Sequence, residues 1–429
     1  MEYSSGDLQA EHLCVLVHGL WGNPSHMVSI ADFLRSKHPD DKLRILVAKA
    51  NTGRFTYDGI DRGGERVCAE IEAEVQRIRE AGGNVRRFSL VGYSLGGLII
   101  RYTAGLLQAN GFLDTVECMN FVTFASPHLG SRTPSKGIHS DIWNGLGARV
   151  LSISGRQLFT IDDFRGTGKP LLSVLADRSS VFVAGLKRFK KRVLYSNIAN
   201  DRTAVFYTTC ISRTDPYVDM ERIAPRFVPG YGRVVLDPVM PFDPTPVTPV
   251  PKPLSVRAAR ILRLAPIFAG LALIIPVGVV VFLVAAAYHT LLSSKRIRLY
   301  ELGQGGVTLD KYRPALWIEE MRSEVDHVYD TLSGAQGESY LESEGSADES
   351  SGLMHHKRRN SSPVHPTLAL SPEQFKMIDA MDEVGWTKYP VWIRNDMHTH
   401  AAIIVRFDKP SFEEGKMVLS HFVEEAFEI

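Results

Sequence analysis

One stretch constrains the fold of this chain more than any other. A short run of strand-forming residues, Phe88 to Val91, leads directly into Gly-Tyr-Ser-Leu-Gly at 92–96, and a helix-compatible run, Leu98 to Leu107, follows. Glycine at both ends of the pentapeptide permits a turn so tight that a Cβ would collide with a neighbouring strand or helix. The pattern predicts a strand, a sharp turn and a helix, with the Ser94 hydroxyl exposed at the carboxyl end of a central strand. The alternative is a serine that caps an ordinary helix.

Apolar runs and amphipathic runs alternate on both sides of this stretch. The apolar runs do not alternate with polar residues, which is typical of parallel strands buried on both faces. We therefore expect an α/β fold with a doubly wound, mostly parallel sheet, and a functional site at the carboxyl ends of its strands. The further predicted strands are His12 to Val17, Leu43 to Ala48, Glu117 to Ala125, Val193 to Ile198 and Trp386 to Arg394. The further predicted helices are Pro24 to Ser36, Gly63 to Glu80, one that starts at Ser371 and one over Ser411 to Phe427.

Composition narrows the possible classes of protein. The chain has 429 residues and a formal net charge of +1, which gives no reason to expect a nucleic-acid partner. Its four cysteines show no Cys-x-x-Cys spacing and are predicted to be buried thiols in a reducing compartment. The polar, acidic start, Met1 to Ala10, does not resemble a secretory signal peptide, so the active domain is expected to face the cytosol.

Shifts in composition predict the domain organisation. The expected parts are an α/β core over 1–220, a proline-rich linker over 221–257, a hydrophobic membrane anchor over 258–298, a connecting segment over 299–335, a disordered insert over 336–366 and a C-terminal part of the core over 367–429.

Regular alternation is lost within the core between residues 131 and 189. This segment is predicted to be a lid-like insertion over the serine, or else a helical insertion with no gating role. It ends in a basic cluster, Lys187 to Arg192, which would meet anionic lipid headgroups or form a solvated face.

The hydrophobic segment is long enough to cross a bilayer. No Lys, Arg, Asp or Glu occurs from Leu264 to Ser294, whereas basic residues flank both ends. Pro276 lies near its middle, where it favours a bend, and the flanking charges fit two cytosolic ends. The alternative is a buried core helix.

A serine nucleophile needs a base within hydrogen-bond reach and an acid that orients the base. In the α/β-hydrolase fold these residues follow one another as Ser, Asp or Glu, and His. Asp201 lies just beyond a predicted strand and is the preferred acid, with Asp215 as the alternative. His400 precedes an apolar run and is the preferred base, with His398 as the alternative.

The predicted oxyanion donors are two backbone N–H groups. One belongs to Leu95, which follows the nucleophile. The other belongs to Leu20, in the glycine-containing loop His18 to Gly22 after the first strand. His18 itself fits a structural role in this loop better than that of the base.

Five motifs together resemble those of the fungal putative serine esterases, a family that includes a lipid-droplet phospholipase. They are His18 to Gly22, Thr56 to Asp61, Gly92 to Gly97, Ala125 to Gly130 and Asn200 to Thr203. The resemblance covers about the first 220 residues well and His398 to Arg406 more loosely; the elbow has Tyr93 where many lipases carry histidine. It implies hydrolysis of acyl esters, with glycerophospholipids as substrates, and no metal or other cofactor.

The order of these residues bears on the hydrophobic segment. Ser94 and Asp201 precede it and His400 follows it, so a single span would separate the base from the nucleophile. We therefore expect a hairpin or re-entrant anchor, and a location on a lipid droplet or on the cytosolic face of the endoplasmic reticulum. An acyltransferase using the same triad and a non-catalytic membrane-anchored binding protein are the alternative functions.

Overall fold

The computed structural model describes residues 4–132, 152–243 and 367–429, together with Tyr288, Leu292, Lys295 and Arg298. The hydrophobic anchor apart from these four residues, the connecting segment and the disordered insert predicted above lie outside the described residues. No helix in the described ranges has both the length and the apolar content that a membrane crossing requires.

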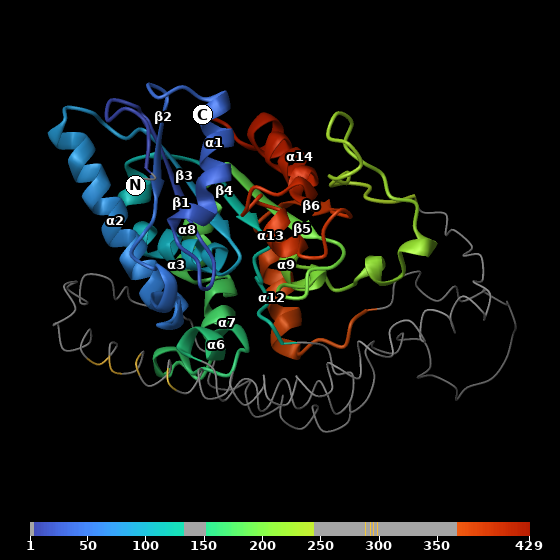
Figure 1. The fold of residues 1–429 in the computed structure, drawn as a ribbon. Coiled ribbons are helices and arrows are strands. Elements are labelled where there is room, and N and C mark those ends of the chain that lie inside the picture. The colour runs from blue at the N-terminus through green and yellow to red at the C-terminus, as the bar shows by residue number, and fades with distance from the viewer. Residues whose placement is uncertain are drawn as a thin grey trace, which may run out of the picture.

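Six strands form one sheet in the order β2-β1-β3-β4-β5-β6, and every pair of neighbours is parallel (Figure 1). The strands are β1 (His12–Val17), β2 (Leu43–Val47), β3 (Arg87–Tyr93), β4 (Glu117–Phe124), β5 (Lys191–Asn197) and β6 (Thr387–Val391). Every residue of β1 and β2 is buried, as expected for apolar runs covered on both faces. The predicted parallel, doubly wound arrangement is confirmed.

Alternate residues of each strand enter two separate cores. On β1, Leu13 and Val15 pack into the first core, whereas Cys14 and Leu16 pack into the second. The first core is covered by α2 (Ile60–Glu80), α3 (Leu95–Ala109), α7 (Leu171–Ala176), α8 (Val181–Lys187) and α12 (Pro372–Asp382). The second is covered by α1 (Val28–Lys37), α14 (Glu413–His421) and the π-helical turn η9 (Phe422–Ala426).

Short elements connect these layers. They are η1 (Pro24–Met27), η2 (Gly53–Tyr57), η3 (Phe112–Asp114), α6 (Ile153–Leu158), η5 (Phe164–Gly166), α9 (Phe206–Thr209), η6 (Pro216–Arg222), α13 (Thr399–Ala402) and η8 (Pro410–Phe412). Several predicted helices differ in their bounds. The first is divided into η1 and α1, and α2 begins at Ile60 rather than Gly63. The helix predicted over Ser411 to Phe427 is divided into η8, α14 and η9. Gly63 and Gly64 weaken the helical signal, but a Cβ on Gly64 would lie 2.6 Å from the Tyr102 ring, so close packing explains that glycine.

The segment predicted as a lid-like insertion contributes α6, α7 and α8 within its described part. Phe182 of α8 is buried and packs directly on Gly105 of α3, so α8 belongs to the layer that covers the sheet. Residues 133–151 of this segment lie outside the described residues. The gating role stays a prediction.

The basic cluster lies at the amino end of β5, whereas the predicted site is at the carboxyl ends of the strands. Arg188 forms an ion pair with Asp114 at 2.8 Å, and Lys191 forms one with Glu428 at 2.7 Å. These pairs favour the solvated face over a headgroup site. All four cysteines are buried and none of them forms a disulfide, which confirms the prediction of buried thiols.

Candidate active site

Ser94 stands on a sharp turn between β3 and α3. Its backbone angles, φ 54° and ψ −125°, are unusual for a residue other than glycine. A Cβ on Gly92 would lie 2.6 Å from the Gly97 backbone, and one on Gly96 would lie 2.2 Å from the Val17 carbonyl oxygen. These contacts with helix and strand are the collisions that the sequence predicted, and they explain why both positions are glycine. The turn is therefore locked in a strained conformation that presents the serine.

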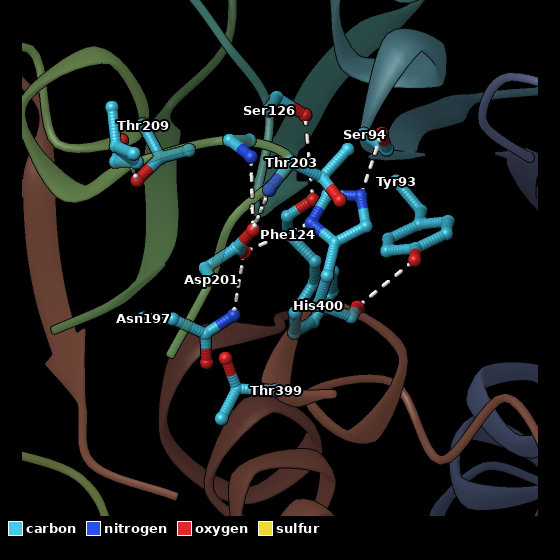
Figure 2. Close-up of polar contacts among 12 residues, drawn as sticks. Tyr93, Ser94, Phe124, Ser126, Asn197, Asp201, Thr203, Thr209, Thr399 and His400 are labelled. Atoms are coloured by element: carbon cyan, nitrogen blue, oxygen red, sulfur yellow. Dashed lines mark hydrogen bonds and ion pairs between the residues drawn. The ribbon is translucent and has the colours of Figure 1, made fainter. Parts of the chain in front are cut away.

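His400 reaches Ser94 from the far end of the chain. It is the second residue of α13, and its Nε2 lies 2.9 Å from Ser94 Oγ (Figure 2). The structure forms one helical turn at this point. The pair is partly screened from solvent, because Ser94 is 7% exposed and the His400 side chain 15%.

Asp201 lies on the other side of the imidazole, with Oδ2 2.9 Å from His400 Nδ1. The same carboxylate accepts hydrogen bonds from the Asn197 amide at 3.0 Å and from the N–H groups of Thr203 and Ala204 at 3.0 and 2.8 Å. Burial alone would raise the pKa of Asp201, but the His400 imidazole and these donors outweigh burial and hold that pKa below its ordinary value.

The charge of Asp201 determines which nitrogen of the His400 imidazole carries the proton. An ionised carboxylate can only accept, so His400 Nδ1 carries the hydrogen and donates it to Asp201. His400 Nε2 is then free to accept the hydrogen bond of the Ser94 hydroxyl. This arrangement can remove the proton from a serine as the serine attacks an electrophile.

The loop after β1 lies against the nucleophile. A Cβ on Gly19 would come within 2.7 Å of the Ser94 Cβ. The Gly19 carbonyl accepts hydrogen bonds from His18 Nδ1 and from the Gly22 N–H, both at 3.0 Å. Because a trans peptide directs its N–H opposite to its carbonyl, the Leu20 N–H is turned away from His18. His18 thus has the loop role that its position in the sequence favoured.

The second predicted donor, Leu95, is the first residue of α3, so its N–H is one of those that no carbonyl of the helix can pair. The oxyanion roles of Leu20 and Leu95 stay predictions. Within the described ranges, no three His, Cys, Asp or Glu side chains are arranged to bind a metal ion.

The alternative acid and base have other partners. Asp215 caps η6 and accepts the Tyr217 N–H at 3.0 Å. His398 precedes α13, and its N–H is bound by Asp396 Oδ1 at 2.7 Å. The structure thus brings the preferred residues, Asp201 and His400, to Ser94.

Three further polar residues make contacts around the site. Asn197 binds Asp201, the Tyr93 hydroxyl donates to the His400 carbonyl, and the Thr399 hydroxyl donates to the Ala199 carbonyl. The sequence singled out Tyr93 only as the residue that replaces the histidine of many lipases, and its contact with His400 was not predicted. Asn197 and Thr399 carry no motif, and only the approach of distant segments reveals their partners.

Comparisons with known proteins agree with this geometry. Residues 7–214 match the family described as "Putative serine esterase (DUF676)". The putative lipase ROG1 of Saccharomyces cerevisiae is 31% identical over 206 residues, which are 47% of this chain and 28% of that protein. A putative lipase of Schizosaccharomyces pombe is 28% identical over 222 residues, 49% of this chain and 27% of that protein. The chain thus spans little more than a quarter of the length of these relatives.

Solved structures are similar at a lower level. They include phospholipase PlaB from Legionella pneumophila in complex with thio-NAD, with a TM-score of 0.31, 16% identity, and coverage of 46% of this chain and 40% of that one. A lipase-esterase related protein from Clostridium acetobutylicum has a TM-score of 0.27, 14% identity, and coverage of 48% and 82%.

The family match contains Ser94 and Asp201 and ends before His400, which the tertiary structure alone brings to them. The elbow, the loop after β1 and the Asp201 turn all lie inside residues 7–214, the part of the chain that matches the putative serine esterase family.

Proposed function

We propose that this chain is a membrane- or lipid-droplet-associated serine lipase that hydrolyses the acyl esters of glycerophospholipids. The observation that carries the proposal is the hydrogen-bonded series of Ser94 Oγ, His400 Nε2 and Asp201 Oδ2, with both distances at 2.9 Å. The match of residues 7–214 to the serine esterase family supports ester hydrolysis as the reaction. The choice of phospholipids rests on the resemblance described above.

In the proposed reaction, Ser94 Oγ attacks the ester carbonyl carbon while its proton moves to His400 Nε2. Negative charge develops on the carbonyl oxygen, where the N–H groups of Leu20 and Leu95 would stabilise it. His400 then gives the proton to the departing alcohol, which leaves an acyl ester on Ser94. Water, activated by the same imidazole, releases the fatty acid and restores the serine.

The proposed membrane anchor must be compatible with this site. Ser94 and His400 are in hydrogen-bond contact, so the chain before the hydrophobic segment and the chain after it are on the same side of any membrane. The anchor is therefore proposed to be a hairpin, which suits a lipid droplet or the cytosolic face of the endoplasmic reticulum. Labelling of residues 220 and 320 from each side tests this, and labels on opposite sides would exclude the hairpin.

The test of the proposed reaction is hydrolysis of phosphatidylcholine, phosphatidylethanolamine and triacylglycerol in detergent micelles. Ser94→Ala and His400→Ala are expected to lose activity at least several hundredfold, because each removes a group that forms or breaks a bond. His398→Ala is the matched control and is expected to retain most activity, since its neighbour His400 is the residue bound to Ser94.

Each other outcome has a definite meaning. Loss of activity only in His398→Ala would identify His398, two residues before His400, as the base. Transfer of the acyl group to an added lysolipid in preference to water would favour the acyltransferase alternative. A wild-type protein as inert as Ser94→Ala on all three lipids would contradict the lipase and favour the binding protein.

A further inference from the structure

The position of His400 depends on a very short helix. The helix α13 has four residues and no side chain caps its N-terminus. Helices of this length do not form by themselves in water, so tertiary contacts must hold α13 in place. The chain reaches it only after residues 244–366, which gives it no local link to Ser94 or Asp201.

The first contact comes from the elbow itself. The Tyr93 hydroxyl donates a hydrogen bond to the backbone carbonyl of His400 at 2.9 Å (Figure 2). Tyr93 is 2% exposed, and its ring centroid lies 5.2 Å from that of the His400 imidazole. Burial raises the pKa of Tyr93 well above its ordinary value, so the hydroxyl keeps its proton and remains a donor.

The second contact comes from the loop that carries the acid. The Thr399 hydroxyl donates to the Ala199 carbonyl at 3.0 Å, and Thr399 is fully buried. Ala199 is two residues before Asp201. One side of α13 is therefore fastened next to the nucleophile and the other next to the acid.

We propose that Tyr93 and Thr399 are positioning residues that set the distance from His400 to both Ser94 and Asp201. The Tyr93 hydroxyl contacts the backbone of His400, and the Thr399 hydroxyl contacts the backbone of Ala199. Neither hydroxyl is proposed to contact the reacting ester. Loss of either hydroxyl leaves a partly buried carbonyl without the hydroxyl donor that it has here, and frees α13 to shift. Since a displacement of about 1 Å in a catalytic group costs about a hundredfold in rate, a smaller shift is enough to be measured.

This inference rests on the proposed function, because the role of His400 as base gives the distance its importance. The test therefore examines both the proposed hydrolysis and the positioning of His400. The full-length protein in detergent is treated with a fluorophosphonate probe, which labels an activated serine, and is assayed with a short-chain p-nitrophenyl ester.

Tyr93→Phe retains the ring and removes only the donor. We expect kcat and the rate of probe labelling to fall about tenfold, the equivalent of one buried hydrogen bond, with KM unchanged. The matched control is Tyr195→Phe. Tyr195 lies on β5, which β4 separates from β3, and it is also fully buried and bonds His421 Nδ1 at 2.7 Å. This control is expected to lower the melting temperature while kcat and labelling stay at wild-type values.

Thr399→Val, which keeps the shape of the side chain, is the second variant. It is expected to lower kcat and the rate of probe labelling as Tyr93→Phe does, and it keeps the inference testable if Tyr93→Phe fails to fold. Wild-type labelling in Tyr93→Phe and Thr399→Val would overturn the inference and leave the proposed function standing. An equal fall of kcat in Tyr195→Phe would also overturn it, since general destabilisation would then explain the loss. No labelling of the wild type would overturn the proposed function and this inference together.

Discussion

At the scale of single residues, the protonation of one imidazole decides the chemistry. Asp201 accepts from His400 Nδ1 and from three other donors, so its charge is stabilised and it holds one tautomer of the histidine. That tautomer leaves Nε2 with a lone pair directed at Ser94 Oγ. In the proposed reaction, Asp201 thus acts by orienting His400 rather than by taking the proton itself.

This reading predicts the effect of Asp201→Asn. The amide has the shape of the carboxylate but favours the opposite tautomer of His400, so we expect a fall in kcat of about 10⁴-fold. Asp215→Asn is the matched control, because its side chain oxygen can still accept the Tyr217 N–H, and wild-type kcat is expected. Hydrolysis of a p-nitrophenyl ester measures both variants. A mild effect of Asp201→Asn would contradict the assigned tautomer.

At the scale of elements, the elbow is held by the close packing of α3 with its neighbours. Gly97 on α3 lies where a Cβ would meet Ser126 Oγ at 2.0 Å, and Gly105 lies where a Cβ would meet the Phe182 ring at 2.1 Å. The helix is therefore clamped between the loop after β4 and α8. Fixed packing of α3 in turn fixes Ser94 at its N-terminus.

Gly105→Ala tests the packing of α3 on α8. The new Cβ would lie 2.9 Å from the Phe182 Cα as well as against its ring, so rotation of the ring alone cannot relieve the overlap. We expect the free energy of unfolding to fall by about 1–3 kcal/mol, although alanine favours a helix over glycine by about 1 kcal/mol. Urea unfolding measures the change.

A second substitution separates packing from helix propensity. The double variant of Gly105→Ala and Phe182→Leu is expected to be more stable than the sum of the stability losses of the two single variants predicts. The reason is that the smaller side chain makes room for the Cβ. An increase in stability in Gly105→Ala alone would contradict the prediction, because it would show that α8 moves away from the new Cβ without loss of packing energy.

At the scale of the whole molecule, buried histidines in the described residues make folding sensitive to acid. Burial lowers the pKa of His12 to about 3 and that of His421 to about 4, from 6.5. Both rings are almost fully buried, with hydrogen bonds to Ser89 and Tyr195 respectively. The folded chain thus holds these rings neutral where the unfolded chain would protonate them.

The sign of the pH dependence follows from linkage. Above pH 6.5 neither state protonates these histidines, and as the pH falls toward 4 only the unfolded state binds protons, so stability is lost. We expect the free energy of unfolding to fall by about 1.4 kcal/mol per histidine for each pH unit below about pH 6. Urea unfolding at pH 7 and pH 5 measures it, and equal or greater stability at pH 5 would contradict the prediction.

The sequence by itself determined the strands, the order of the helices and the tight turn that carries Ser94, because these depend on local signals: apolar runs, glycines that permit a tight turn, and helix caps. The start of α12 shows this directly, since Ser371 and Gln374 cap each other as the local sequence suggests. Asp201 and His400 were also preferred from the sequence, through their places after predicted strands and the residue order of the fold.

Only the tertiary structure showed that His400 contacts Ser94 and that Asp201 contacts His400. It also showed which residues hold His400 and Asp201 in place. Those contacts join residues about 200 to 300 positions apart, as Thr399 to Ala199 and Tyr93 to His400 do. No periodicity or motif encodes such a pair, because a hydrogen bond of this kind depends on where separate elements come to rest. The sheet brings the carboxyl ends of β3, β5 and β6 to one edge, and that convergence in space assembles the site.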